Sequence, residues 1–192
     1  MKVLGIVGSP RRGGNTQQVM EEFLQSCTEE GLQTEIILLA DLNIRPCQEC
    51  LFCKTNRKCK NDRDDFLPVY NKMLNSDAIV VASPVFFGSA TAEITALLDR
   101  AGYLGIAMGR PFEKKVGGAI AVARRAGHNF TLMQLLHFFL YHGMVIPGST
   151  YWNMVIGKEP GEVLQDTEGM ATVKNFAGNI AWLLKKIHQD KR

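Results

Sequence analysis

Apolar runs and amphipathic stretches alternate along this 192-residue chain. Short, mostly apolar runs such as 1–7 and 77–82 are bounded by turn residues and are typical of buried strands. Between such runs, apolar residues recur every three or four positions, as Val19, Phe23 and Cys27 do, which predicts a helix with one buried face. In chain order, the pattern predicts strands over 1–7, 34–39, 77–82, 115–123 and 144–146, and helices over 16–30, 66–74, 92–101, 130–141 and 169–187.

The alternation of strands and helices predicts the fold class. Strands separated by helices form a parallel sheet with helices on both faces, and each crossover is expected to be right-handed. The sequence contains neither an internal repeat nor a low-complexity linker, so we predict a single domain over 1–192 with a cysteine-rich insertion at about 45–62. Ligands of such sheets bind beyond the carboxyl ends of the strands. The loops that deserve inspection are therefore 8–16, 40–61, 83–91 and 123–129.

Composition and charge narrow the classes of partner. Hydrophobic residues make up 46% of the chain, and 22 basic against 19 acidic residues give a net charge of +3. This mild, evenly spread charge does not favour nucleic acid as a partner. The first apolar run ends at Gly8, too early for a signal peptide, and no run approaches the roughly 18 apolar residues of a membrane span. We therefore expect a cytoplasmic protein without a membrane partner, in which clustered cysteines indicate metal or catalysis.

The loop after the first predicted strand, "GSPRRGGNT" (8–16), favours a phosphate group. It is not a P-loop, because Gly14 stands where that motif needs lysine and Asn15 where it needs Ser or Thr. The dinucleotide fingerprint G-x-G-x-x-G is also missing. The loop opens onto a helix N-terminus, where free N–H groups and the helix dipole favour an anion, and one phosphate monoester fits it best. The alternative is a turn that ends in a simple helix cap.

The loop after the third predicted strand, "SPVFFGSA" (83–90), carries two adjacent aromatic residues. Phe86 and Phe87 lie between Pro84 and Gly88, which shape the backbone. A flat heterocycle needs an apolar wall for its face and backbone polar groups for its edge, and this loop offers both. Aromatic residues in this position also occur in cores and subunit interfaces, so that alternative stays open.

Four of the five cysteines lie within residues 47–59 with the spacing C-x2-C-x2-C-x5-C. Three thiolates at intervals of three can surround one iron–sulfur cluster, and a fourth after a short excursion can complete the ligand set. Zinc prefers two ligand pairs with a longer spacer, a redox pair would leave two cysteines unexplained, and disulfides or an empty site remain alternatives. Five cations nearby would stabilise a negative cluster or form a solvated basic loop: Lys54, Arg57, Lys58, Lys60 and Arg63. The fifth cysteine, Cys27, lies on a predicted apolar stripe and is expected in the core.

Three motifs together resemble a known superfamily: "GSPRRGGNT" (8–16), "SPVFFGSATAEITALLDR" (83–100) and "VARRAGHNFTLMQLLHFFLYHGMVIPGSTYWN" (122–153). They resemble the flavodoxin-like NAD(P)H-dependent FMN reductases, and with the cysteine spacing the chain is similar to the iron–sulfur flavoproteins. The resemblance implies a flavodoxin-like, doubly wound, five-stranded parallel sheet of order 2-1-3-4-5 with helices on both faces. It also implies a homodimer or homotetramer with FMN near a subunit interface.

The same resemblance implies the roles of individual residues. The FMN phosphate would be held by Ser9, Arg11, Asn15 and Thr16. The isoalloxazine would be bordered by Pro84, Val85, Phe86, Phe87 and Gly88, and approached from the next loop by Ala123, Arg124, Gly127 and Asn129. A [4Fe–4S] cluster would be held by Cys47, Cys50, Cys53 and Cys59. No residue is predicted to act as a catalytic acid or base.

These cofactors predict a flavin-dependent oxidoreductase and electron-transfer protein. By the same resemblance it would pass electrons between a one-electron carrier such as ferredoxin and an acceptor, which in the family includes oxygen and peroxide. The alternative is an NAD(P)H-dependent FMN, quinone or azo-compound reductase without a functional cluster. A third interpretation is a flavin-binding module without catalytic turnover.

Overall fold

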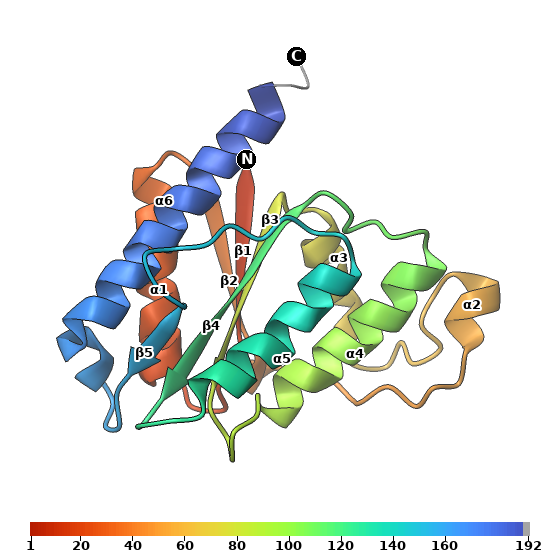
Figure 1. The fold of residues 1–192 in the computed structure, drawn as a ribbon. Helices are drawn as coiled ribbons and strands as arrows, with labels where there is room; N and C mark the ends of the chain where they lie inside the picture. Colours follow the sequence, from red (N-terminus) through yellow and green to blue (C-terminus); the bar gives the residue numbers. More distant parts are fainter. Residues whose placement is uncertain (190–192) are drawn as a thin grey trace.

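Five parallel strands form one sheet in the order β2-β1-β3-β4-β5 in the computed structural model, which describes residues 1–189 (Figure 1). This confirms the predicted flavodoxin-like order, while the last three residues of the predicted 1–192 domain lie outside the described part. The strands are β1 (Lys2–Val7), β2 (Gln33–Leu38), β3 (Ala78–Pro84), β4 (Val116–Ala123) and β5 (Met154–Ile156).

The central strands are apolar on both sides because helices cover both faces of the sheet. β4 is buried along its whole length and β3 along all but its last residue, as is typical of parallel sheets. Val7 at the end of β1 pairs with Leu38 of β2 and with Ala82 of β3. This register brings the carboxyl ends of neighbouring strands to one edge, at the bottom of Figure 1.

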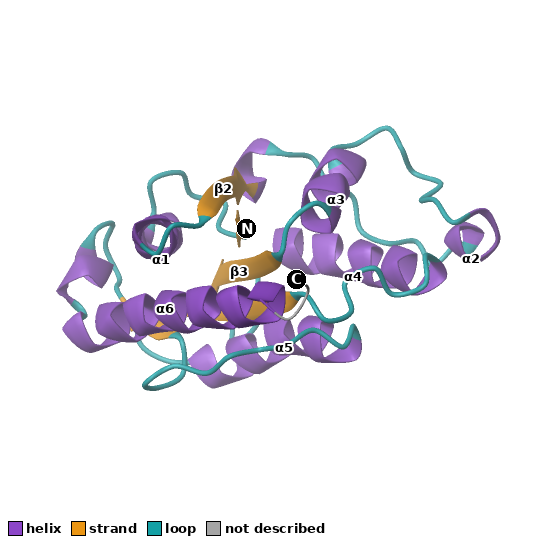
Figure 2. Cartoon of the chain, turned by 90° about the horizontal axis from the view of Figure 1, so that it is seen from above, coloured by secondary structure: helices purple, strands orange, loops and turns teal. Residues whose placement is uncertain are grey.

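Two hydrophobic cores lie on opposite faces of the sheet (Figure 2). On one face, α1 (Asn15–Glu29) and α6 (Thr167–Gln189) pack on the sheet, where Phe23 and Phe176 are in ring contact. The other face is covered by α3 (Phe66–Leu74), α4 (Ala92–Ala107) and α5 (His128–Tyr141). The short α2 (Phe52–Asn56) lies at the periphery, beside α4. Two 3-10 turns, Leu39–Asp41 and Glu162–Gln165, complete the elements; within the described residues no helix has the length and apolar content to span a membrane.

The predicted fifth strand was wrong. The segment 144–146 makes only an isolated parallel bridge, between Val145 and Val116, and the fifth strand is Met154–Ile156. Proline follows directly at position 147, and it lacks the N–H that a continuing ladder needs. β5 pairs with the end of β4 instead, and its carboxyl end therefore reaches the same edge of the sheet as those of β3 and β4.

One helix boundary matters for the sites described below. The helix predicted over 92–101 continues to Ala107, and it ends just before Gly109, whose φ is 84°. The additional residues include Tyr103 and Leu104, which lie beside the cysteine-rich insertion of about 45–62, called the cysteine segment below. The short helix α2 within this segment was not predicted.

Candidate functional site

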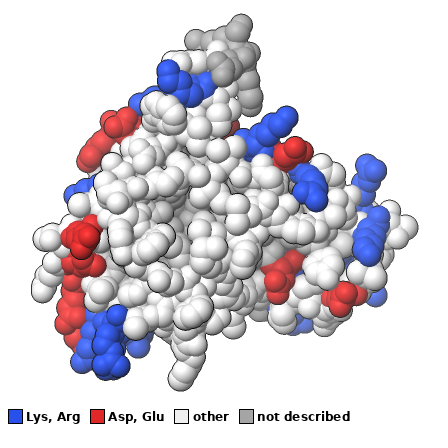
Figure 3. Space-filling view, in the orientation of Figure 1, with Lys and Arg blue, Asp and Glu red and all other residues white. Residues whose placement is uncertain are grey.

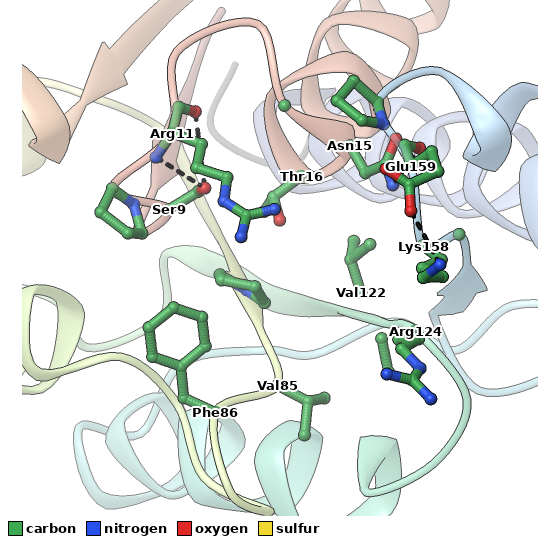
Figure 4. Close-up of a pocket in the computed structure, with 16 residues that line it drawn as sticks. Ser9, Arg11, Asn15, Thr16, Val85, Phe86, Val122, Arg124, Lys158 and Glu159 are labelled. Atoms are coloured by element: carbon green, nitrogen blue, oxygen red, sulfur yellow. Dashed lines mark hydrogen bonds and ion pairs between the residues drawn. The ribbon is translucent and has the colours of Figure 1, made fainter.

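A cavity of about 380 Å³ opens at the carboxyl edge of the sheet (Figure 4). Its volume lies in the range of roughly 300–1,000 Å³ that is usual for small-molecule sites. The loops after β1, β3, β4 and β5 all contribute to it. Its walls are formed by Ser9, Pro10, Arg11, Gly14, Asn15, Thr16, Pro84, Val85, Phe86, Val122, Ala123, Arg124, Gly157, Lys158, Glu159 and Pro160.

The loop after β1 ends at a helix N-terminus without a side-chain cap. Gly14 is the N-cap residue of α1, and no carboxylate lies in the first turn. The first N–H groups of the helix are therefore available to an anion, which the helix dipole also favours. Ser9 is buried, and its Oγ accepts the N–H of Arg11 at 3.2 Å, which closes the loop. Figure 4 shows the Arg11 side chain extending over the cavity beside Thr16.

Asn15 lines the cavity, but its side chain serves the neighbouring loop. Its Nδ2 donates to the carbonyl of Glu159 at 2.9 Å, and its Oδ1 accepts the N–H of Gly161 at 2.8 Å. Both polar atoms of the amide thus bond to residues that are 144 or more positions away in the sequence. In the described structure Asn15 fixes the loop after β5 against the helix N-terminus, in addition to any contact with a ligand.

The loop after β3 forms a tight turn that separates its two aromatic residues. Phe86 and Ser89 exchange backbone hydrogen bonds of 2.8 and 3.0 Å, and the residues between them, Phe87 and Gly88, have φ values of 51° and 79°. Phe86, 47% exposed, lines the cavity, whereas Phe87 is fully exposed to solvent at the tip of the turn. Phe86, Val85 and Val122 form the apolar side of the cavity, as a flat ring would require.

Four of the thirteen predicted flavin-site residues do not line the cavity: Phe87, Gly88, Gly127 and Asn129. Gly127 nevertheless has a local role, because a Cβ there would lie 2.7 Å from Cγ1 of Val85, and its φ is 93°. Only glycine allows the loop after β4 to approach the β3 turn so closely. Asn129 is exposed, in the first turn of α5.

Thr91 connects the loops after β1 and β3. Its buried hydroxyl donates to the carbonyl of Gly8 at 2.6 Å and accepts the N–H of Ile94, as the cap of α4. Its own N–H donates to Oγ of Ser83 at 3.1 Å. Thr91 thus holds the two loops together.

Sequence reasoning missed the wall of the cavity that follows β5, formed by Gly157, Lys158, Glu159 and Pro160. The cause is the misplaced fifth strand, since the loop after 144–146 was not among those inspected. The signal was present in "MVIGKEPG" (154–161), an apolar run that ends in a glycine- and proline-containing turn. Lys158 and Arg124 add positive charge to this side of the cavity, and Glu159 pairs with Lys158 at 3.0 Å.

A second cavity, of about 310 Å³, brings all four clustered cysteines together. It shares no lining residue with the first cavity. The cysteine segment forms one side, and Arg100, Tyr103 and Leu104 of α4 form the other. Sγ of Cys53 contacts the carbonyl of Tyr103 at 3.9 Å. The complete lining is Arg45, Pro46, Cys47, Gln48, Glu49, Cys50, Leu51, Cys53, Cys59, Lys60, Asn61, Arg100, Tyr103 and Leu104.

The four thiols are close enough to affect one another electrostatically. Burial raises the pKa of Cys53 most, and negative charge on Cys47, Cys50 and Cys59 raises it further. Within residues 1–189, however, no three His, Cys, Asp or Glu side chains converge as a ligand set for a metal ion. A tetrahedral zinc site requires four sulfurs at about 2.3 Å from one atom. An iron–sulfur cluster is larger than one metal ion, and its thiolate ligands surround the whole cluster. Four cysteines that line one cavity therefore fit an iron–sulfur cluster better than a single zinc ion.

A buried ion pair supports the cysteine cavity. The side chains of Arg100 and Asp64 are 2% and 0% exposed, and Nη1 of Arg100 donates to the Asp64 carboxylate. Burial alone would raise the pKa of Asp64, but the bonds from Arg100 and from the N–H groups of Arg45 and Phe66 outweigh it and hold the pKa below its ordinary value. Sequence reasoning missed Arg100, although a single arginine on an otherwise apolar helix face was visible in "ALLDRAGYL" (96–104).

Comparisons with known proteins agree with this geometry. The sequence model of a family described as NADPH-dependent FMN reductase matches residues 1–159. An iron–sulfur flavoprotein of Methanocaldococcus jannaschii is 40% identical over 194 residues, covering 97% of this chain and 99% of the relative. Another, of Methanosarcina thermophila, is 32% identical over 193 residues, covering 100% of this chain and 99% of the relative. A solved flavodoxin from the domain Archaea has a TM-score of 0.64 at 16% identity, covering 96% of this chain and 99% of that one, which supports the fold alone.

The sheet order defines a class of fold, the flavodoxin-like α/β proteins, and the family match makes this protein a flavin-dependent oxidoreductase of that fold. The family match and the near full-length relatives are more specific. This chain belongs to the NADPH-dependent FMN reductase family and, within it, to the iron–sulfur flavoproteins.

Proposed function

We propose that this protein carries FMN and one [4Fe–4S] cluster and passes electrons between a one-electron carrier and an acceptor. One observation carries the proposal: a cavity suited to a flavin and a separate cavity lined by four cysteines occur together in one chain. Bound FMN exchanges one or two electrons and a [4Fe–4S] cluster exchanges one, so the pair can join single-electron donors to two-electron acceptors.

The first cavity is proposed to bind FMN through its phosphate and its ring. The uncapped N–H groups of α1, with Ser9, Thr16 and Arg11, would hold the phosphate. The apolar side formed by Val85 and Phe86 would exclude water from one face of the ring.

Cys47, Cys50, Cys53 and Cys59 are proposed to hold the cluster in the second cavity. Their number and their shared cavity match the four thiolates that a [4Fe–4S] cluster takes. The cavity volume of about 310 Å³ is far larger than one metal ion needs. It is roughly ten times the ~30 Å³ share of one liquid water molecule.

An acidic one-electron carrier such as ferredoxin is the proposed donor. Five cations on or beside the cysteine segment are exposed: Lys54, Arg57, Lys58, Lys60 and Arg63. Blue side chains lie along the right side of Figure 3, on the side where Figure 1 places α2. Opposite charge accelerates encounter, and salt weakens it, so reduction by the carrier should slow as ionic strength rises.

A second copy of this chain is the proposed partner for the uncharged face in the centre of Figure 3. α5 contains no Asp, Glu, Lys or Arg, and its side chains Phe130, Leu140 and Tyr141 are at least 58% exposed. Exposed apolar surface of this kind marks interfaces. Sedimentation of the purified protein should give a dimer or a tetramer, and a monomer at micromolar concentration would contradict this part of the proposal.

Anaerobic purification followed by cofactor analysis tests the central proposal. We expect one FMN, four iron and four acid-labile sulfide per chain, with flavin absorbance and a broad cluster absorbance. Stopped-flow mixing should then show fast bleaching by reduced ferredoxin and slow bleaching by NADPH. Protein without iron after anaerobic reconstitution would contradict the proposal.

The second candidate function is an NAD(P)H-dependent FMN, quinone or azo-compound reductase without a functional cluster. It is favoured by one observation, the match of residues 1–159 to the NADPH-dependent FMN reductase family. It predicts the reverse kinetics, with fast anaerobic reduction by NADPH or NADH and slow reduction by ferredoxin.

A further inference from the structure

Arg100 has an unusual position for a charged residue. Among residues 1–189 it is the only Lys, Arg, Asp or Glu that is buried as a whole, at 3% exposure. It lies in the middle of α4 and lines the cysteine cavity. A charge is buried only where its partners offset the lost hydration, so these partners indicate what Arg100 does.

The guanidinium of Arg100 bonds to both ends of the cysteine segment. Nη1 donates to the carbonyl of Arg45 at 3.2 Å, just before the first cysteine, and to the carboxylate of Asp64. Nη2 donates to the carbonyl of Asn61 at 2.8 Å and to Sγ of Cys59 at 3.3 Å. Asp64 in turn accepts the N–H of Arg45 at 3.0 Å, which closes the network. One side chain thus joins the entry and the exit of the segment to α4.

Packing fixes the plane of the guanidinium, and one donor remains unused. The guanidinium carbon of Arg100 lies 4.0 Å from the centre of the Phe66 ring, in a cation–π contact. Its Nε is buried and has no hydrogen-bond partner within the described residues. A buried N–H without an acceptor is rare and requires an explanation. A sulfide or thiolate in the adjoining cavity would be an acceptor for it.

We infer that Arg100 is the positioning residue of the cluster site: it fixes the fourth cysteine, Cys59, and raises the reduction potential of the cluster by donating to its sulfur. The inference rests on the proposed function, because it presupposes a cluster in the second cavity. Hydrogen bonds and positive charge at the sulfurs favour the more reduced, more negative state of a cluster.

The exposed cations of the segment cannot replace Arg100 in this role. They are exposed, so water screens their charge, and although Lys60 lines the cavity, none of them donates a hydrogen bond to a cysteine sulfur within the described residues: Lys54, Arg57, Lys58, Lys60 and Arg63. Within the described residues, Arg100 is the only charged side chain that donates a hydrogen bond to a cysteine sulfur. The buried side chain therefore acts on the cluster at short range and at low local dielectric constant.

The test compares R100K with the matched control R63K, which changes an exposed arginine just after the segment that makes no polar contact within the described residues. Both substitutions keep the charge, but lysine at position 100 lacks the planar fork that reaches four acceptors. The two variants and the wild type are reconstituted anaerobically. Iron and sulfide per FMN, the melting temperature, the EPR spectrum of the reduced cluster and its midpoint potential are then measured.

We expect R100K to keep its FMN and its fold, and R63K to match the wild type throughout. If R100K binds the cluster, the cluster should show a lower midpoint potential and an altered EPR spectrum. If R100K instead loses most of its iron while its FMN content and melting temperature are kept, that result also supports the inference. A full cluster with an unchanged potential in R100K would overturn it. So would loss of FMN and fold together with the cluster, because Arg100 would then be only a core residue. Absence of iron in the wild type contradicts the proposed function instead, so the two failures are distinguishable.

Discussion

The two cavities of this protein are built in different ways. The flavin cavity lies where four strands end, and its loops are short and follow directly from the ladder of the sheet. The cysteine cavity lies between α4 and the long connection from 42 to 65, which is held mainly by side chains such as Asp64 and Arg100. The difference teaches that sheet topology brings the loops of the first site together, where Thr91 and Asn15 then join them, whereas the second site depends on polar side chains that reach across a long connection.

The backbone reflects the same contrast. In the cysteine segment three residues other than glycine have left-handed conformations, Glu49, Leu51 and Arg57, with φ values of 48°, 55° and 52°. Each such residue costs on the order of 1 kcal/mol or more. The loop of 8–16 places glycine, Gly13, at its own left-handed position, with φ at 63°, and in the loops of the flavin site only Phe87, with φ at 51°, is a left-handed residue other than glycine. The cysteine segment therefore carries more backbone strain than the flavin loops, and the Arg100 network holds its two ends in place.

The largest expected effect separates the two cavities completely. In C50S, an exposed cysteine loses its sulfur, and we expect nearly all cluster iron to be lost while FMN binds as in the wild type. The free energy of unfolding of the cluster-free protein should change by less than about 0.5 kcal/mol, as for other exposed sites. Iron and sulfide analysis measures the loss of the cluster, flavin analysis measures FMN binding, and urea unfolding measures the stability.

Cys27→Ala is the matched control for C50S. Cys27 is buried in the core, which raises the pKa of its thiol to about 12, and it lies outside both cavities. Its replacement should cost about 1 kcal/mol of stability through lost packing and leave iron and FMN unchanged. If C50S lost FMN as well as iron, the two sites would not be independent.

The second prediction concerns the residue that connects the loops of the flavin cavity. T91V removes the hydroxyl that bonds Gly8 and caps α4. We expect a loss of about 2 kcal/mol in the free energy of unfolding and weaker FMN binding, because a buried carbonyl loses its partner and a helix loses its cap. Urea unfolding and FMN titration check this. In the control T95V, the lost hydroxyl donates only to the backbone carbonyls of Thr91 and Ala92 at the start of the same helix, so the stability should change by less than about 0.5 kcal/mol.

The third prediction concerns the phosphate end of the flavin cavity. R11Q should raise the dissociation constant of FMN about tenfold, equivalent to about 1.4 kcal/mol, and leave that of riboflavin unchanged, because only FMN carries the phosphate. The neighbouring R12Q is the control, since Arg12 is largely exposed and pairs with Asp41 at 2.6 Å. Equal losses for FMN and riboflavin in R11Q would place the phosphate elsewhere. Fluorescence titration of the apoprotein gives the constants.

The smallest expected effect concerns the pH dependence of stability and comes from His142, which lies outside both cavities. Burial, and secondarily Arg110, lowers the pKa of His142, which is 1% exposed and whose two ring nitrogens have no hydrogen-bond partner within the described residues. A base with a lowered pKa in the folded state is protonated more readily when unfolded, so its stabilising contribution is present above the unfolded pKa of about 6.5 and is lost as pH falls below it.

The variant H142L should therefore lose stability less steeply than the wild type between pH 7 and pH 5, in urea unfolding at each pH. The control variant is H137L, which replaces an exposed histidine of the preceding helix α5. FMN and iron contents should not change in either variant. An identical slope in H142L and wild type would show that His142 is not the source.

The sequence by itself determined the alternating elements, the parallel sheet and the residues of the loops after β1, β3 and β4, because these depend on local periodicity and on motifs a few residues long. The spacing of the cysteines likewise implied that they would share one cavity, as they do. Only the tertiary structure decided that β5 is 154–156, since strand identity depends on which neighbour supplies its hydrogen bonds. It also decided that Asn15 holds the loop at 159–161 and that Arg100 reaches Cys59, 41 residues away in sequence, because such contacts arise from helix packing and leave no local pattern in the chain.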